Sequence, residues 1–187
     1  MKDLTNIEFY NTPEGEVMIH DDIGVRVFTE KDRDVIMLLI TRLTEFYPEA
    51  LESLSGWFDK NKHNRRFFEF LIVKQFLKCN FGNFDSVLDV DQFGSFHFEE
   101  VSCPLRGTCK HEGIVCKPKF NSKLSERELE VMKMFCQGAN SDKIADSLFL
   151  SPATVATHKR NALQRLDLHS LAEFISYAHK NNIFKED

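Results

Sequence analysis

Residues 124–131 of this chain read Leu-Ser-Glu-Arg-Glu-Leu-Glu-Val, and residues 148–161 read Leu-Phe-Leu-Ser-Pro-Ala-Thr-Val-Ala-Thr-His-Lys-Arg-Asn. Each segment contains a serine directly before a helical pattern, which is a signal for the start of a helix. Ser125 and Glu128 have the spacing of a capping box. Ser151 is followed by a proline at the first helical position, where the missing N–H costs nothing. These signals predict that two helices begin at fixed points in the C-terminal third of the chain.

Two further helices complete this region. Gly138 is suited to end the first helix, because glycine adopts the left-handed conformation that closes a helix. The region therefore predicts four short helices, and together they make this part of the protein all-helical. The expected N-caps are Ser125, Ser141, Ser151 and Ser170.

The third of these helices has two distinct faces. The face expected to point inward holds Val155, Lys159, Ala162 and Leu166. An inward lysine requires its aliphatic stem to lie along the rim of the core. The opposite face carries Ala153, Ala156, Thr157, Arg160 and Gln164. Short side chains and hydrogen-bonding groups around one arginine suit a helix that lies in the major groove of DNA.

This stretch resembles the LuxR-type helix-turn-helix domain, which is found at the C-terminus of many bacterial transcription regulators. It follows the pattern Leu-Ser-x-Arg-Glu-x-Glu-Val, Gly, Lys-Ile-Ala-x-x-Leu and Leu-Ser-x-x-Thr-Val-x-x-His-x-x-Asn. The resemblance implies a four-helix domain whose third helix reads duplex DNA. By the same resemblance, the base-contacting positions are Ala156, Thr157 and Arg160. The positions near the DNA backbone are Ser141, Lys143, Thr154 and Asn161.

The chain departs from the family at one base-contacting position. The family often has a lysine where this sequence has Ala156, so one direct contact is missing. The fourth helix carries Leu171, Phe174, Ile175 and Ala178 on one stripe, which resembles the family's dimer contact. The resemblance therefore implies a homodimer on DNA.

The rest of the chain predicts a separate module. We expect a mainly α protein with an N-terminal α+β sensory or interaction module at residues 1–117, a linker at 118–123 and the DNA-binding domain at 124–187. The negative charge lies in the first part: 15 Lys and Arg against 20 Asp and Glu up to Phe120, and nine of each afterwards. A DNA-binding domain without net positive charge gains little affinity from its overall field and needs clustered cations or two copies.

Within the N-terminal module, hydrophobic spacing predicts a loose lead-in, a hairpin and three helices. The expected elements are a lead-in at 1–12, a hairpin at 16–28, helices at 29–47, 48–60 and 63–79, and short strands at 92–101. The first helix should bury Val35, Ile36, Leu39, Leu43 and Phe46, and the third Phe67, Phe68, Leu71, Ile72 and Phe76. A phospho-receiver is disfavoured, because the sequence around Asp59 has helical spacing where a receiver has a buried strand.

A cysteine loop precedes the linker. Cys103, Cys109 and Cys116 lie within residues 103–116, where a chain containing glycine and proline can wrap thiolates around a metal. The intervals exceed those of zinc knuckles and are closer to the loop of Rrf2-type iron–sulfur regulators. We expect either zinc or an iron–sulfur cluster, or else a connector with packed thiols. The candidates for a fourth ligand are Cys79, His97 and His111.

The main hypothesis is a sequence-specific DNA-binding transcription regulator with double-stranded DNA as its partner. One alternative is a metal-dependent or redox sensor that acts through the cysteine loop. Another class is an interaction protein that contacts RNA polymerase without selecting DNA. An enzyme localised by a DNA-binding tail is disfavoured, because the sequence has no recognisable catalytic constellation. We expect a cytoplasmic protein without a membrane partner, because it has neither a signal pattern nor a long apolar run.

Overall fold

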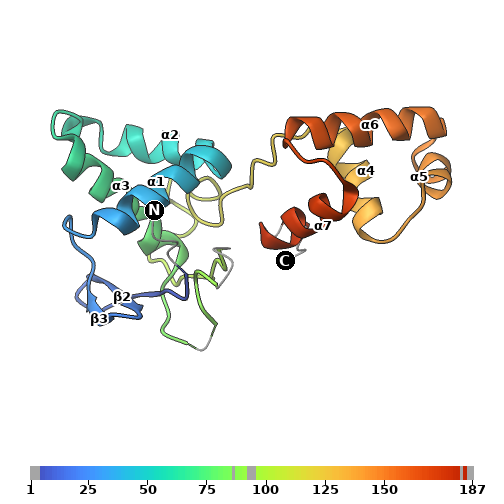
Figure 1. Ribbon diagram of the computed structural model, residues 1–187. Coiled ribbons are helices and arrows are strands. Elements are labelled where there is room, and N and C mark those ends of the chain that lie inside the picture. The colour runs from blue at the N-terminus through green and yellow to red at the C-terminus, as the bar shows by residue number, and fades with distance from the viewer. Residues whose placement is uncertain (1–4, 86, 92–95, 182, 185–187) are drawn as a thin grey trace. The chain divides into compact units, whose positions relative to one another are not determined.

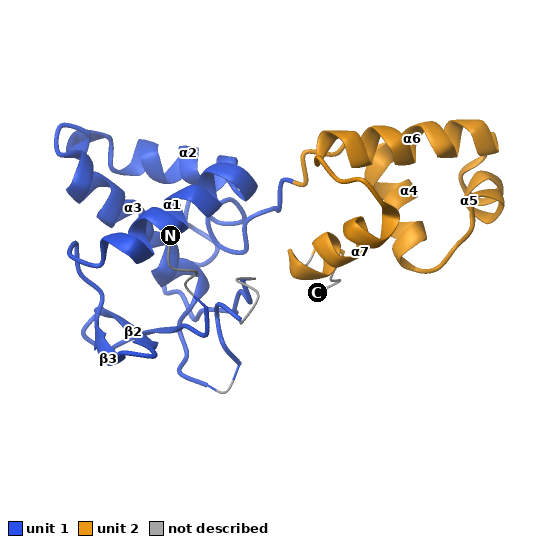
Figure 2. Cartoon of the chain, viewed as in Figure 1, with its two compact units in different colours: residues 1–121 blue, residues 122–187 orange. Residues whose placement is uncertain are grey.

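The computed structural model describes residues 5–85, 87–91, 96–181 and 183–184. The chain divides into two compact units, Met1–Asn121 (unit 1) and Ser122–Asp187 (unit 2), coloured separately in Figure 2. In chain order the elements, most of them labelled in Figure 1, are β1 (Glu8–Asn11), β2 (Val17–Asp21), β3 (Gly24–Val27), α1 (Arg33–Phe46), α2 (Pro48–Trp57), a 3-10 turn η1 (Asp59–Asn61), α3 (Arg65–Asn80), α4 (Glu126–Cys136), α5 (Ser141–Leu148), α6 (Pro152–Arg165) and α7 (Leu171–Lys180). The predicted fold class, mainly helical with an α+β N-terminal part, is confirmed. None of the described helices is long and apolar enough to cross a bilayer.

The sheet of unit 1 contains one strand more than the sequence predicted. The expected hairpin is present as β2 and β3, and β1 pairs antiparallel with β2 in the order β1-β2-β3. The prediction of a loose lead-in at 1–12 was therefore wrong. Phe9 pairs in register with Ile19, and both side chains are fully buried. Burial of Phe9 favours a strand here, which a short segment of mixed pattern does not reveal.

Helices α1, α2 and α3 pack against one another, and α3 contacts β1 and β2. The apolar stripe predicted for α1 is confirmed: its buried residues are Val35, Ile36, Leu39, Leu43 and Phe46. The face predicted for α3 is confirmed at Ile72 and Phe76, which are buried, and was wrong at Phe67, Phe68 and Leu71, which are only half-buried. The buried residues of the helix are Glu69, Ile72, Val73, Phe76, Leu77 and Asn80. Glu69 turns inward because Arg33 and Arg65 both pair with its carboxylate.

The last part of unit 1, after α3, has little regular secondary structure. Of the strands expected at 92–101, residues 92–95 lie outside the described ranges, and residues 96–101 form only an isolated bridge between Val90 and Phe96. Phe96 and Phe98 both contact the rings of Tyr47 and Phe76 instead of alternating between two faces. Ring packing, rather than a strand ladder, therefore holds this segment.

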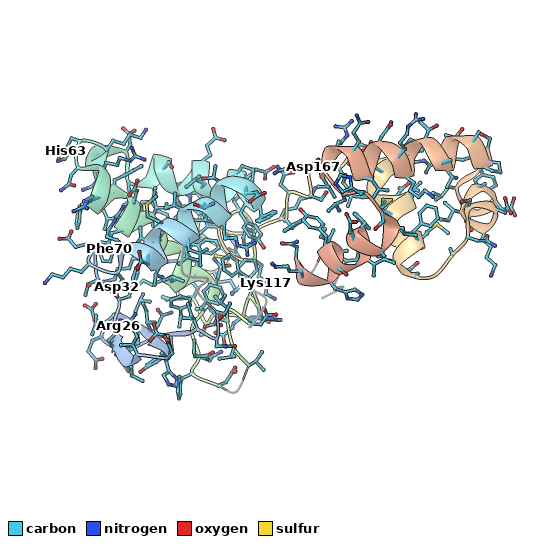
Figure 3. The ribbon with its side chains drawn as sticks, in the orientation of Figure 1. Arg26, Asp32, His63, Phe70, Lys117 and Asp167 are labelled. Atoms are coloured by element: carbon cyan, nitrogen blue, oxygen red, sulfur yellow. The ribbon has the colours of Figure 1, made fainter. Side chains whose placement is uncertain are left out.

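One ion-pair network links the sheet to the start of α1. The Arg26 guanidinium contacts Asp21 at 2.8 Å and Asp32 at 3.2 Å. Arg26 and Asp32 are labelled in Figure 3. Asp32 also accepts a hydrogen bond from the Thr29 N–H. The turn between β3 and α1 is thereby fixed without a side-chain cap on the helix itself.

Unit 2 contains the four predicted helices with most of the predicted caps. Ser125 and Glu128 form the complete capping box, and Ser151 and Ser170 cap α6 and α7. Gly138 follows α4 with a φ of 82°, as expected for a glycine that closes a helix. The cap predicted for the second helix was wrong by one residue. Asn140, not Ser141, accepts the hydrogen bond from the Lys143 N–H.

A buried carboxyl group lies between β1 and the segment that follows α3. Asp89 is fully buried and accepts a 2.6 Å hydrogen bond from the Phe9 N–H, while its Oδ1 has no partner among the described residues. Burial, reinforced by the nearby charge of Glu8, raises the pKa of Asp89 to about 9. Asp89 is therefore protonated in the folded protein at neutral pH.

We predict that Asp89→Asn flattens the pH dependence of the stability of unit 1. The folded pKa lies above the ordinary value of 3.8, so the unfolded chain releases a proton that the folded chain retains. Folding stability then falls as pH rises between 3.8 and about 9, by up to about 1.4 kcal/mol per pH unit. Asparagine does not titrate, and its side-chain oxygen can accept the same hydrogen bond. Urea titrations at several pH values, followed by the fluorescence of Trp57, measure the effect.

The matched control is Glu14→Gln at an exposed position, which should leave the wild-type pH profile unchanged. A stability difference between Asp89→Asn and the wild type that is the same at pH 5.5, 7 and 8.5 would contradict the assignment.

Phe149 ends α5 in a strained conformation. Its φ of 53° lies in the left-handed region, and its side chain is 95% exposed. We predict that Phe149→Gly stabilises unit 2 by roughly 1 kcal/mol, because a residue with a Cβ pays about that cost in this conformation. Hydrogen exchange of buried amides in α4 and α6 measures the change. Phe149→Ala is the control, since it removes the ring and keeps the strain; equal stability of the two variants would exclude strain as the cause.

Candidate nucleic-acid interface

Helix α6 is held on the other helices of unit 2 by two small buried side chains. Val155 and Ala162 are fully buried, and α6 packs against both α4 and α5. The helix begins at the Ser151 cap, whose hydroxyl accepts a 3.1 Å hydrogen bond from the Thr154 N–H. Because its start and its inner face are both fixed, α6 presents its outer face in one orientation.

The outer face is the one that the sequence predicted. All five residues assigned to it are exposed: Ala153, Ala156, Thr157, Arg160 and Gln164. Thr154 and Asn161, assigned to the DNA backbone, are half-buried. The Thr157 hydroxyl donates to the Ala153 carbonyl at 3.0 Å, so towards a ligand it offers its lone pairs and methyl group. This face therefore combines small side chains with two long hydrogen-bonding groups, Arg160 and Gln164.

Two other cations of α6 are engaged within unit 2. Lys159 is half-buried, and its ammonium lies 5.4 Å from the centre of the Phe135 ring, as an inward lysine with its stem along the rim requires. The Arg165 guanidinium pairs with Glu128 at 3.2 Å. In the described part of the chain, Arg160 forms no ion pair with another residue. Arg160 is therefore the cation of α6 that is available to a ligand.

Helix α5 supplies the remaining predicted contacts. Ser141 is its first residue and is half-buried, and Lys143 is exposed in the first turn. The turn from α5 to α6 is anchored by Arg127, which donates a 2.6 Å hydrogen bond to the Leu148 carbonyl. The sequence reading did not single out this role for Arg127. The contact closes the C-terminal end of α5, where a cation is favoured by the helix dipole.

The cysteine loop belongs to unit 1, whereas α6 belongs to unit 2. Cys103, Cys109 and Cys116 are half-buried and line one small pocket together with Arg106 and Glu112. Among the described residues, no three His, Cys, Asp or Glu side chains are arranged to hold a metal ion. The structure thus brings the three predicted cysteines together, with their sulfurs short of a ligand geometry.

Comparison with known proteins identifies the C-terminal unit. Residues 122–178 match the family model of bacterial regulatory proteins, luxR family. The chain is 48% identical over 62 residues to the virulence-factor transcription regulator BvgA of Bordetella pertussis. These residues make up 33% of this chain and 30% of BvgA. It is 40% identical over 60 residues to the oxygen regulatory protein NreC of Staphylococcus carnosus, which covers 32% of this chain and 28% of NreC.

A third relative agrees with these two. The Fimbriae Z protein of Salmonella typhimurium is 38% identical over 60 residues, which covers 32% of this chain and 29% of that protein. The chain thus spans less than a third of the length of these curated relatives. The C-terminal unit of this chain is therefore a helix-turn-helix domain of the luxR family of bacterial regulatory proteins.

Proposed function

We propose that this protein is a sequence-specific DNA-binding transcription regulator that places α6 in the major groove. The observation that carries the proposal is the outer face of α6, where exposed small residues surround Arg160 on a rigidly held helix. A helix with such a face can approach base edges closely. The relatives support a regulatory role, since BvgA is named as a transcription regulator and NreC as a regulatory protein. We infer that the protein binds DNA and does not catalyse a reaction. We place it in the cytoplasm, with the DNA that it binds.

Each residue of the interface has an expected role in this proposal. Arg160 is suited to the O6 and N7 acceptors of guanine. Thr157 and Gln164 lie one turn on either side of it and provide further hydrogen-bonding groups. Lys143 and Ser141, at the start of α5, lie where a phosphate is favoured by the helix N-terminus. Ala156 adds only a methyl surface.

The charge of unit 2 favours binding as a homodimer. With nine cations and nine anions from Asn121 onward, the unit has no net charge to attract DNA. Several of those cations are engaged in internal contacts, so one copy makes few phosphate contacts. On α7, Phe174 and Ala178 are buried in the unit's own core, while Leu171 and Ile175 remain half-exposed for a second copy.

We predict that Arg160→Ala weakens binding to the selected DNA site by about 1–3 kcal/mol and relaxes the base preference at one position. Its side chain makes no ion pair in the described structure, so helix content should stay unchanged. Lys143→Ala should instead weaken binding to all sequences equally and reduce the salt slope by about one. Selection from random duplex DNA followed by fluorescence anisotropy measures both effects.

The control is Lys60→Ala, an exposed lysine of unit 1 that should leave DNA affinity unchanged. If Arg160→Ala selects the same DNA sequence with the affinity of the wild type, α6 is not the reading helix.

We also predict that binding requires two half-sites. Ile175→Glu should reduce affinity for DNA with two half-sites while leaving affinity for a single half-site unchanged, because the charge disrupts only the contact between copies. Footprinting and analytical ultracentrifugation of the complex measure site length and stoichiometry. Protection of one half-site alone at saturating protein would rule out dimeric binding.

A further inference from the structure

The cysteine loop meets a fourth cysteine at the end of α3. Cys79 lies in the last turn of α3, directly before Asn80, whose side chain bonds to both chain neighbours of Cys116. Gln75 donates a hydrogen bond to the Cys79 Sγ at 3.3 Å. Two segments that lie 37 residues apart in the sequence are therefore held beside each other at Cys79 and Cys116.

The neighbouring Asn80 fixes this contact. Its side chain is fully buried, donates to the Val115 carbonyl at 2.8 Å and accepts from the Lys117 N–H at 2.7 Å. These two bonds hold the backbone on both sides of Cys116; Lys117 is labelled in Figure 3. The position of Cys116 beside the end of α3 is thus determined by hydrogen bonds of the Asn80 side chain.

The remaining two cysteines reach the same place through tight turns. The Arg106 N–H donates to the Cys103 carbonyl, and the Cys109 N–H donates to the Leu105 carbonyl. Cys103 and Cys109 line one small pocket together with Cys116. Three of the five cysteines of the chain therefore surround this pocket, and Cys79 lies at the end of α3 that Asn80 ties to Cys116.

Neither histidine candidate belongs to this group. His97 pairs through Nε2 with Asp91 at 3.1 Å. His111 contacts Ser53 through Nδ1 at 2.7 Å, and its ring is stacked on Trp57 with a centroid distance of 4.2 Å. The His111 Nε2 is buried without a partner among the described residues, but His111 does not line the pocket formed by the cysteines.

We propose that Cys79, Cys103, Cys109 and Cys116 form a four-thiolate site for a thiophilic metal centre, either a zinc ion or an iron–sulfur cluster. Both groups take four cysteine thiolates as ligands. Among the described residues no three of these side chains stand in a ligand geometry, so binding must bring the sulfurs closer together. With zinc, each thiol transfers its proton to solvent as its sulfur–metal bond forms, and nothing is oxidised or reduced.

The surroundings are suited to such a centre. The thiolate is the species that binds the metal, so metal binding is coupled to the release of protons from the thiols. Arg106 lines the pocket and can balance the negative charge of the thiolates. Glu112 accepts a 2.6 Å hydrogen bond from the Gly107 N–H and so fixes the turn between Cys103 and Cys109.

The test is the metal content of the full chain purified without oxygen. We expect about one zinc ion per chain, or iron with matching acid-labile sulfide and visible absorption; the two results separate the two metal centres. Cys79→Ser and Cys109→Ser should each lose most of the metal, whereas Cys136→Ser in unit 2 and His111→Gln should retain it. A metal-free wild-type protein, or metal retained by Cys79→Ser and lost by His111→Gln, would overturn the assignment.

A second measurement needs no variant and so does not depend on whether the serine variants fold. In the metal-loaded protein, four of the five thiols should resist alkylation by N-ethylmaleimide until a chelator is added. Equal alkylation rates with and without chelator would overturn the proposal. Because both readouts are taken without DNA, a metal-free protein that still selects DNA refutes only the metal site, and a metal-loaded protein that selects no DNA refutes only the DNA-binding function.

Discussion

The arrangement of unit 2 depends on one buried carboxylate. Glu128 is 2% exposed, accepts a 2.8 Å hydrogen bond from the Ser125 N–H and pairs with Arg165 at 3.2 Å. Burial alone would raise the pKa of Glu128, but the bonds to Ser125 and the charge of Arg165 outweigh it and keep the pKa lowered. A single carboxylate therefore caps the start of α4 and holds the end of α6, so the orientation of α6 is tied to the first turn of the unit.

This internal use of charge decides how the unit can bind DNA. Arg165 is engaged by Glu128, Lys159 by the ring of Phe135, and Arg127 by Glu130 and the end of α5. The cations that orient the helices are then not free to neutralise phosphates, and nonspecific attraction is weak. As we propose, recognition of DNA rests on base contacts from Arg160 and on a second copy, because each copy has few other cations to offer.

The sequence predicted unit 2 better than unit 1 for a physical reason. Caps and capping boxes are local, so Ser125 with Glu128 and Ser151 could be read directly, although Asn140 was passed over for its neighbour. In unit 1 the deciding contacts are long-range. Glu69 turns inward because Arg33 from another helix pairs with it together with Arg65, and β1 is a strand that pairs with β2 and buries Phe9. The helical period of the sequence was enough to predict which residues of α6 lie on its outer face. It does not predict which of them contact bases, because those contacts also depend on the DNA.

The same reasoning explains why the sequence alone did not decide among the candidates for a fourth ligand. Spacing groups Cys103, Cys109 and Cys116, but Cys79 is brought beside Cys116 only through the fold, where Asn80 fixes the backbone around Cys116. The segment from residue 96 to 121 has no described helix or strand and is held by ring packing and single hydrogen bonds. Such a segment gains more from a cross-link than a helix does, because a bound ion restricts backbone that no ladder restricts. A thiolate centre at this point would therefore stabilise a part of unit 1 that regular secondary structure leaves unsupported.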